Sequence, residues 1–350
     1  MTHRERFFNV VTHKKCDRVI LDLCGCPQTQ IYDRRLITDE FLLKYDIDTR
    51  IVGGMPTPKT VHNRAENDIY YDNYGIGYKH LNGYSEICFN PLRDRDIDYI
   101  MAYPMPEAKD IDVNIIKEWT KKAEWLHKNT DYAVIAEHPV LGVFEIGCWM
   151  FGFDDYLYRL AAEPEVVHAF SERILEYQKG MIELYYGYLG NFIDCTTSGD
   201  DFGTQTGTFM SADMFDSLIK PYFKERISYT KKYTDAFYQH HTCGSIHALM
   251  PNLIECGIDI LNPIQPGTYM MEPERLKKDY GDKMSFWGGI DTQHLLPEGT
   301  VDDVKNEVKR ILSIMDCEGY ILAPAHNIQK DVPFENLEAI YEGALEYYKL

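Results

Sequence analysis

Eight short apolar runs recur along this chain of 350 residues, and each is followed by a helix-like segment or an insertion. The runs lie near residues 20, 48, 134, 193, 238, 260, 286 and 321. Strands that alternate with helices in this way are typical of a (β/α)8 TIM barrel, with parallel strands inside and helices outside. The sequence therefore predicts one barrel domain over residues 1–350, with an insertion near residues 55–110.

The predicted insertion interrupts the alternation between the second and third runs. Its middle reads IYYDNYGIGYKHLNGYSEICF, which is aromatic and punctuated by glycine. This pattern predicts a β-hairpin whose turn lies near Leu81-Asn82-Gly83. We expect the insertion to cover the mouth of the barrel or to contact a partner protein.

Charge and hydropathy limit the classes of partner. Lys and Arg total 36 against 55 Asp and Glu, which gives a formal net charge of -19. This balance argues against nucleic acid and against an anionic membrane surface. No apolar run approaches the ~18 residues of a membrane span, and the polar N-terminus does not resemble a secretion signal. We therefore expect a cytoplasmic protein that binds neither nucleic acid nor membrane, and a homodimer is left open.

Nine cysteines occur at irregular spacings, which does not predict a disulfide framework in a chain of this length. Cys24-x-Cys26 could be a metal-binding pair, but no second pair accompanies it, so packing is the favoured interpretation. Most of the others are also expected to be free thiols that pack in the fold: Cys16, Cys88, Cys148, Cys195, Cys256 and Cys317.

The stretch from Asp235 to Pro266 has a strand-helix-strand pattern, and its first strand ends in His241-x-Cys243. Imidazole and thiolate are preferred ligands of Zn²⁺, and two residues apart at a strand end they can point the same way. His326 follows the last predicted strand and could supply a third ligand. The alternative is a hydrogen-bonded core histidine beside a buried thiol, since short pairs of this kind also occur by chance.

Polar side chains follow several other predicted strands, where a barrel places its active site. Adjacent carboxylates at the start of a helix can bind substrate, orient a ligand or simply cap the helix. Asp291 follows Gly288-Gly289, which indicates either a close backbone approach to a cofactor or a tight turn. The candidates for positioning substrate are Asp200, Asp201, Gln205 and Glu145, and the candidate for contacting a cofactor is Asp291.

Four segments together resemble the uroporphyrinogen decarboxylase-like superfamily. They read HHTCGSIHALMPNLIECGIDILNPIQP, SGDDFGTQTGTFMSADMFDSLIKPYFKERI, FWGGIDTQHLLPEGT and LAPAHNIQKDVPFENLEAIYEGA. Within it they are most similar to the zinc- and corrinoid-dependent methyltransferases, over roughly the C-terminal two-thirds from about Asp131. The resemblance implies a (β/α)8 barrel. In the methylcobamide:coenzyme M branch, zinc is held by His-x-Cys and a later Cys, which correspond to His241, Cys243 and the position of His326.

The resemblance thus implies a methyltransferase with Zn²⁺ held by His241, Cys243 and His326. The methyl group would move between a small methylated substrate or thiol and a corrinoid carried by a separate protein. A cofactor-free decarboxylase of the parent type is the alternative, but the first strand ends in LCGCPQTQIYD, without that enzyme's Arg-rich run. A non-catalytic binding protein on the same barrel is a third hypothesis.

Overall fold

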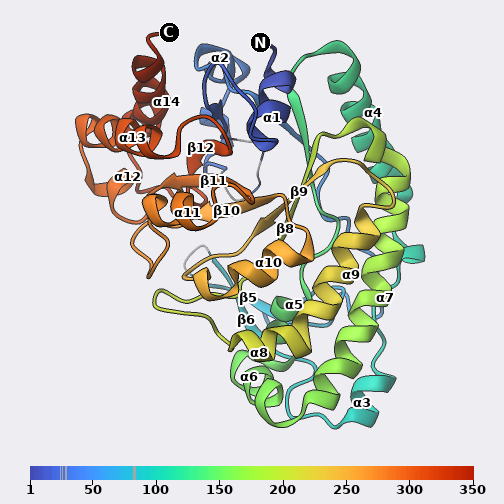
Figure 1. Ribbon diagram of the computed structural model, residues 1–350. Coiled ribbons are helices and arrows are strands. Elements are labelled where there is room, and N and C mark those ends of the chain that lie inside the picture. Colours follow the sequence, from blue (N-terminus) through green and yellow to red (C-terminus); the bar gives the residue numbers. More distant parts are fainter. Residues whose placement is uncertain (24, 26, 28–29, 82–83) are drawn as a thin grey trace.

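The computed structural model describes residues 1–350 apart from 24, 26, 28–29 and 82–83 (Figure 1). Its central sheet has eight parallel strands in the order β1-β12-β11-β10-β9-β8-β7-β2. The edge strands β1 and β2 lie next to each other and close the barrel: the Asp48 N–H, just before β2, donates to the Leu21 carbonyl oxygen at 3.0 Å. The fold is therefore the predicted (β/α)8 barrel, built from β1 (Ile20–Leu21), β2 (Thr49–Val52), β7 (Ala133–Glu137), β8 (Cys195–Gly199), β9 (Phe237–His241), β10 (Ile260–Ile264), β11 (Ser285–Ile290) and β12 (Tyr320–Pro324).

Helices surround the strands (Figure 1). Along the described chain, no helix is long and apolar enough to cross a membrane. The α-helices are α1 (His3–Val11), α2 (Asp39–Lys44), α3 (Ile97–Ala102), α4 (Val113–Asn129), α5 (Val143–Phe151), α6 (Phe153–Ala162), α7 (Pro164–Leu189), α8 (Ala212–Met214), α9 (Lys220–Thr230), α10 (Met250–Cys256), α11 (Pro273–Tyr280), α12 (Leu295–Glu298), α13 (Val301–Met315) and α14 (Phe334–Tyr348). Shorter turns are η2 (Arg34–Leu36), η3 (Ala108–Asp110), η4 (Gly190–Phe192), the π-helical η5 (Phe215–Ile219) and η6 (His247–Leu249).

The insertion lies between β2 and β7 and forms a separate antiparallel sheet of four strands in the order β3-β4-β5-β6. The pairing of β5 with β6 is the predicted hairpin, although Asn82 and Gly83 of its predicted turn lie outside the described residues. The strands are β3 (Arg64–Glu66), β4 (Ile69–Tyr71), β5 (Gly77–Leu81) and β6 (Tyr84–Phe89).

Side chains fill the N-terminal end of the barrel. Phe7 and Val10 of α1 belong to one buried apolar cluster with Ile20, Ile260 and Trp287 from the strands. The helix α1 forms because Thr2 and Glu5 build a capping box at its start, and its apolar face then packs on the strand ends. Since this end is filled by side chains, an open site can lie only at the other end, which is formed by the C-terminal ends of the strands.

Several sequence predictions missed a boundary or an element. The apolar run near residue 193 predicts a strand from Phe192, but β8 begins at Cys195, because Phe192 and Ile193 pack outward in the cluster that includes α4. The helix α5 was not predicted, since it is buried on nearly every face and shows no amphipathic period. The composition of residues 31–45 predicts one helix, but the structure has the two short helices η2 and α2, and Ile31 forms a bridge with Ile328.

The prediction that Cys16 and Cys317 are free thiols is wrong, because they form a disulfide across 301 residues of sequence. They precede the neighbouring strands β1 and β12, so only the fold brings them together. Cys88 is an exposed cysteine, and Cys148, Cys195 and Cys256 are buried. Cys24 and Cys26 lie outside the described residues.

Candidate metal centre

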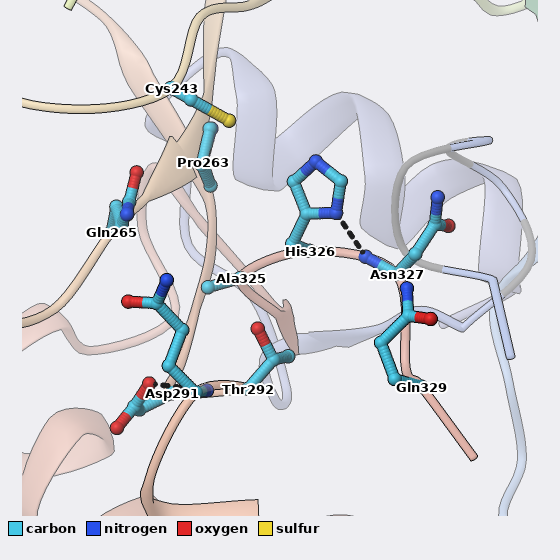
Figure 2. Close-up of a pocket in the computed structure, with 10 residues that line it drawn as sticks. Cys243, Pro263, Gln265, Asp291, Thr292, Ala325, His326, Asn327 and Gln329 are labelled. Carbon is cyan, nitrogen blue, oxygen red and sulfur yellow. Dashed lines mark hydrogen bonds between the residues drawn. The ribbon is translucent and has the colours of Figure 1, made fainter. Parts of the chain in front are cut away.

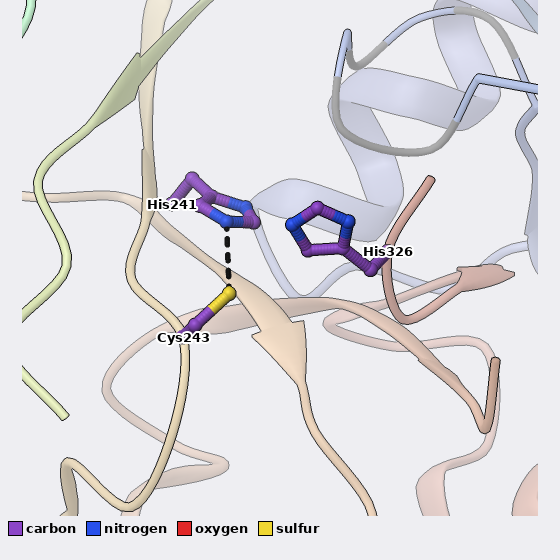
Figure 3. Close-up of side chains that lie close together, drawn as sticks. All are labelled: His241, Cys243 and His326. Carbon is purple, nitrogen blue, oxygen red and sulfur yellow. Dashed lines mark hydrogen bonds between the residues drawn. The ribbon is translucent and has the colours of Figure 1, made fainter. Parts of the chain in front are cut away.

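His241, Cys243 and His326 lie together at the C-terminal end of the barrel (Figure 3). Each offers one ligand atom, and these atoms are all within 4.8 Å of one another. His241 ends β9, while His326 follows β12, and β10 and β11 separate these two strands in the sheet. The side chains therefore reach toward one another across the mouth, as the positions after the strands predict.

The ring of His241 is held by Asn262, a buried residue of β10. Its Nδ1 lies 2.6 Å from Asn262 Oδ1, while the Asn262 amide donates to the Trp287 carbonyl oxygen at 3.2 Å. Because the amide nitrogen is used in this way, the oxygen accepts from His241, which places the imidazole proton on Nδ1. The lone pair of Nε2 is then directed into the site, as in metal-binding histidines with an outer hydrogen-bond partner.

Cys243 lies beside that lone pair, with its Sγ 3.2 Å from His241 Nε2. The main-chain N–H of Cys243 donates to Asp201 Oδ1 at 2.8 Å, and the same oxygen is 3.8 Å from His241 Nε2. Burial and the nearby Asp201 carboxylate raise the pKa of the Cys243 thiol. The sulfur is thus a thiol that donates to His241 until a cation takes its proton's place.

His326 completes the cluster, with its ring centroid 5.4 Å from that of His241. Burial and the neighbouring His241 lower the pKa of His326 to about 4, so its ring is neutral. The Asn327 N–H donates to His326 Nδ1 at 2.8 Å. A neutral imidazole that accepts at Nδ1 carries its proton on Nε2. Unlike His241, His326 must therefore exchange this proton or turn before Nε2 can bind a metal.

Two close backbone approaches shape the loops of the site. Gly244 has φ +85°, and a Cβ there would lie 2.5 Å from the carbonyl carbon of Gly203, so the loops after β8 and β9 touch. A Cβ at Gly142 would lie 1.9 Å from Asp200 Oδ2. Glycine at these positions is needed because any side chain would push the loops apart.

The predicted carboxylates group next to Cys243, and Gln205 stands apart. Asp200 is fully buried and accepts from the N–H groups of Phe144 and Glu145 at 3.2 and 2.8 Å, so it caps the start of α5. Burial raises the pKa of Asp200 to about 6. Burial and the charges of Asp200 and Asp201 raise the pKa of Glu145 well above its ordinary value. Gln205 is exposed, and its carbonyl oxygen accepts from the Tyr269 N–H.

A cavity of about 370 Å³ opens beside Cys243 and His326 (Figure 2). Asp291 lines it, but its carboxylate accepts from the N–H groups of Gln293, His294 and Leu295 at 2.8–3.2 Å. Asp291 therefore stabilises the conformation of the loop after β11. Four carboxamides and one hydroxyl also line the cavity: Gln265, Gln293, Asn327, Gln329 and Thr292.

Asn262 and Gln265 are site residues that the sequence reasoning missed. Both lie in or just after β10, a strand from which no candidate was drawn. A signal was present for Asn262, because it is a polar residue inside the apolar run ILNPI, and buried polar groups need hydrogen-bond partners. Gln265 carries no such signal, since polar residues after a strand are common.

The donor set fits a zinc ion. Two neutral imidazoles and one thiol are ligands that Zn²⁺ takes in proteins, and three protein ligands leave a coordination position open for substrate. Hard cations such as Mg²⁺ and Ca²⁺ prefer oxygen ligands, so this cluster suits them poorly. Together, the fold and the cluster define a class of protein: a (β/α)8 barrel with a nitrogen- and sulfur-rich candidate metal centre at its mouth.

The comparisons give this class a family. The family model for uroporphyrinogen decarboxylase (URO-D) matches residues 100–347, and the chain belongs to this family. Methylcobamide:CoM methyltransferase MtaA from Methanosarcina barkeri is 31% identical over 110 residues, which are 31% of this chain and 30% of that protein. The same enzyme from strain Fusaro is 32% identical over 110 residues, with the same coverage. The chain thus matches less than a third of the length of these relatives.

A solved structure resembles the whole chain. A methyltransferase from Methanosarcina mazei superposes with a TM-score of 0.70 at 15% identity, covering 99% of both chains. At this identity the likeness shows the fold. It agrees with the barrel described above and extends over the insertion as well as the eight strands.

Proposed function

We propose that the protein is a zinc-dependent methyltransferase, which moves a methyl group between a small methylated substrate or thiol and a corrinoid on a separate protein. The observation that carries this proposal is the convergence of two imidazoles and a thiol within 4.8 Å at the barrel mouth. The names of the curated relatives, methylcobamide:CoM methyltransferases, support methyl transfer as the reaction type.

His241, Cys243 and His326 are the proposed zinc ligands. A zinc ion held there would supply Lewis acidity to the heteroatom that gives up or receives the methyl group. The chain prepares the ligands in advance: Asn262 keeps the His241 lone pair in the site, and Asp201 fixes the main chain of Cys243. This support matters because partners of a ligand set its orientation and basicity.

The nearby carboxylates are assigned to positioning. Asp201 and Glu145 lie beside the thiol and would orient the substrate, and Asp200 holds the start of α5 so that Glu145 keeps its place. Gln205 would act at the rim of the site, given its exposure. Asp291 would shape the wall on which a substrate or the corrinoid rests.

The insertion is the proposed contact for the protein that carries the corrinoid. Its sheet exposes large apolar side chains, which is unusual for strands that face only water. A partner that covers this sheet would bury them. The exposed side chains are Tyr70, Leu81, Ile87 and Phe89.

The decarboxylase that gives the family its name is a poorer fit to this site. A cofactor-free decarboxylase of the parent type binds a polyanion and needs cationic groups around it. Among the described residues that line the cavity there is neither Lys nor Arg. The lining therefore favours the methyltransferase over the decarboxylase.

Zinc content and methyl transfer test the proposal. We expect the purified protein to hold about one zinc per chain, measured by mass spectrometry of the metal, since three ligands form one site. Methyl transfer is followed as the absorbance change between cob(I)alamin and methylcobalamin with a panel of methyl ethers, methylamines and thiols. A wild-type protein that stays metal-free in micromolar zinc, or that transfers methyl groups equally well without it, contradicts the proposal.

Variants of the two histidines can be compared by their loss of zinc affinity. His241→Ala should weaken zinc binding more than His326→Ala, because His241 is oriented for a metal and His326 still accepts a hydrogen bond at Nδ1. Asn262→Ala should weaken it by about 10–100-fold, as expected for an outer partner of a ligand. Equal losses for both histidines would show that the orientation of His241 contributes nothing.

A further inference from the structure

Four of the ten residues that line the cavity beside the metal-ligand cluster are carboxamides (Figure 2). Gln265 approaches from β10, Gln293 from the loop after β11, and Asn327 and Gln329 from the loop after β12. Three separate strand ends therefore bring the same uncharged group to one space. Carboxamides both donate and accept hydrogen bonds, so such a wall suits a ligand with neutral polar groups.

Two of these carboxamides are held in place. Gln265 Oε1 accepts from the Gly244 N–H at 2.6 Å, which leaves the Gln265 amide nitrogen as a donor at the wall. With its nitrogen toward the loop after β1, Asn327 donates to the carbonyl oxygens of Pro27 and Gln30 at 2.9 and 3.3 Å. The wall thus offers a fixed donor at Gln265, and the orientation of Asn327 is set by the loop after β1.

Positive charge is missing from this wall. Neither Lys nor Arg is among the described residues that line the cavity, and Asp291 is the one carboxylate among them. The six residues outside the description include no basic residue either, since they are Cys24, Cys26, Gln28, Thr29, Asn82 and Gly83. Proteins hold carboxylates, sulfonates and phosphates with Arg, Lys or the start of a helix. This wall has neither Arg nor Lys, and the N–H groups at and just before the start of α12 already donate to Asp291.

The negative charges next to the proposed metal ligands also disfavour an anionic ligand. Asp201 Oδ1 accepts from the Cys243 N–H at 2.8 Å and lies 3.8 Å from His241 Nε2, so a carboxylate stands directly beside the cluster. The whole chain carries a formal net charge of -19, which repels anions at a distance.

We propose that the substrate is a small neutral molecule with hydroxyl, ether or amide groups, and that the site discriminates against anions such as sulfonates. This inference rests on the proposed function, because it assigns the substrate class of the same site. The carboxamides of Gln265 and Gln329 would pair with the polar end of the substrate, and the reacting heteroatom would face His241, Cys243 and His326. Specificity follows because an anion would lose its hydration without gaining a cationic partner.

Two thiols that share a two-carbon spacer test the inference: neutral 2-mercaptoethanol and anionic 2-mercaptoethanesulfonate. Their Kd values are measured by calorimetry on the zinc-loaded protein, and a cobalt-loaded sample reports sulfur ligation by its charge-transfer absorbance. We expect the neutral thiol to bind about tenfold tighter or more, which is the size of one missing charged hydrogen bond. Gln329→Lys replaces one of the pairing carboxamides with a cation, so it should tighten binding of the sulfonate by about tenfold and shift the ratio of the two Kd values toward the sulfonate.

Asn306→Lys is the matched control, because it adds the same charge on an exposed position of α13, away from the cavity wall. It should leave both Kd values unchanged. Equal or tighter binding of the sulfonate by the wild type, or failure of both thiols to bind at millimolar concentration, overturns the inference. Zinc content is measured first on the same sample. Loss of zinc speaks against the proposed function, whereas a zinc-loaded protein that prefers the sulfonate refutes only the substrate class.

Discussion

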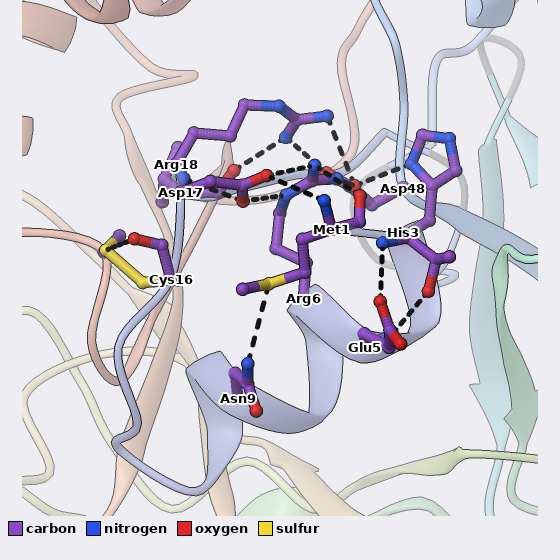
Figure 4. Close-up of polar contacts among 12 residues, drawn as sticks. Met1, His3, Glu5, Arg6, Asn9, Cys16, Asp17, Arg18 and Asp48 are labelled. Carbon is purple, nitrogen blue, oxygen red and sulfur yellow. Dashed lines mark hydrogen bonds and ion pairs between the residues drawn. A yellow bond between two sulfur atoms is a disulfide. The ribbon is translucent and has the colours of Figure 1, made fainter.

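The two ends of the barrel differ in how their buried ionisable groups are paired. At the N-terminal end, the fully buried Asp48 receives Arg6 and Arg18, each at 2.6 Å, and also lies 2.8 Å from His3 Nδ1 (Figure 4). Burial alone would raise the pKa of Asp48, but the bond to His3 and the charges of both arginines hold it below its ordinary value. At this end, the buried carboxylate is therefore paired with cationic side chains.

At the C-terminal end, burial is left partly uncompensated. Asp200 and Glu145 are packed side by side with raised pKa values, and Cys243 keeps its proton in the same cluster. Such groups cost stability in the free protein and become favourable when a cation or substrate arrives. The comparison indicates that paired charges stabilise one end of the barrel, while the uncompensated groups gather at the other end, where the proposed site lies. The two ends can be separated by measuring stability and zinc binding on the same variants.

The largest effect on stability is expected from Asp48→Ala. Removing this carboxylate leaves Arg6 and Arg18 buried without their shared partner, which typically costs about 3–5 kcal/mol. Urea unfolding measures the loss. Asp46→Ala is the control, because Asp46 also pairs with Arg18 but is 53% exposed, so it should cost less than about 1 kcal/mol. Similar losses for both variants would refute the idea that burial makes this network important.

The next effect is expected from the disulfide between Cys16 and Cys317, which ties the entrances of β1 and β12. Reduction should lower the free energy of unfolding by about 2–4 kcal/mol, because the unfolded chain regains the freedom of a very long loop. Thermal unfolding with and without dithiothreitol measures this on metal-free protein. The double variant Cys16→Ala/Cys317→Ala should unfold at the same temperature in both conditions, and a shift in that variant would assign the effect of dithiothreitol elsewhere.

A smaller effect is expected from acid. The bond to Arg6 holds the pKa of Asp17 well below its ordinary value, so its contribution to stability is complete above about pH 4 and is lost as the pH falls further. Asp17 is 42% exposed, so solvent screening limits this contribution to about 1 kcal/mol. Urea midpoints between pH 7 and pH 3 should fall less for Asp17→Asn than for the wild type. Parallel pH profiles would show that this pair does not contribute.

The features predicted correctly from the sequence are those that depend on local patterns of apolar and polar residues. The sequence predicts helices over residues 301–315 and 334–348, and α13 and α14 have these bounds; apolar residues repeat at helical spacing and Thr300 caps α13. The meeting of His241, Cys243 and His326 followed from one topological rule, that all strands of a barrel end on the same side. Long-range pairings were not predictable, because nothing local marks Cys16 and Cys317 as partners or Asn262 as the support of His241.

The smallest effect on stability is expected from Cys243→Ser, although its effect on zinc should be the largest. Cys243 lies after β9 at the cavity and contributes little to the apolar core, so the free energy of unfolding measured with urea should change by less than about 0.5 kcal/mol, as for a surface change. Zinc affinity should fall by more than the roughly 10–100-fold typical of an outer partner, because a hydroxyl replaces a ligand thiolate. Methyl transfer should fall with it. Cys88→Ser, on an exposed thiol of the insertion, should change neither quantity. If Cys243→Ser unfolds the protein, Cys243 is a core thiol and the contrast between the two ends fails. If it transfers methyl groups at the wild-type rate without zinc, the ends still differ in stability, but the metal mechanism is wrong.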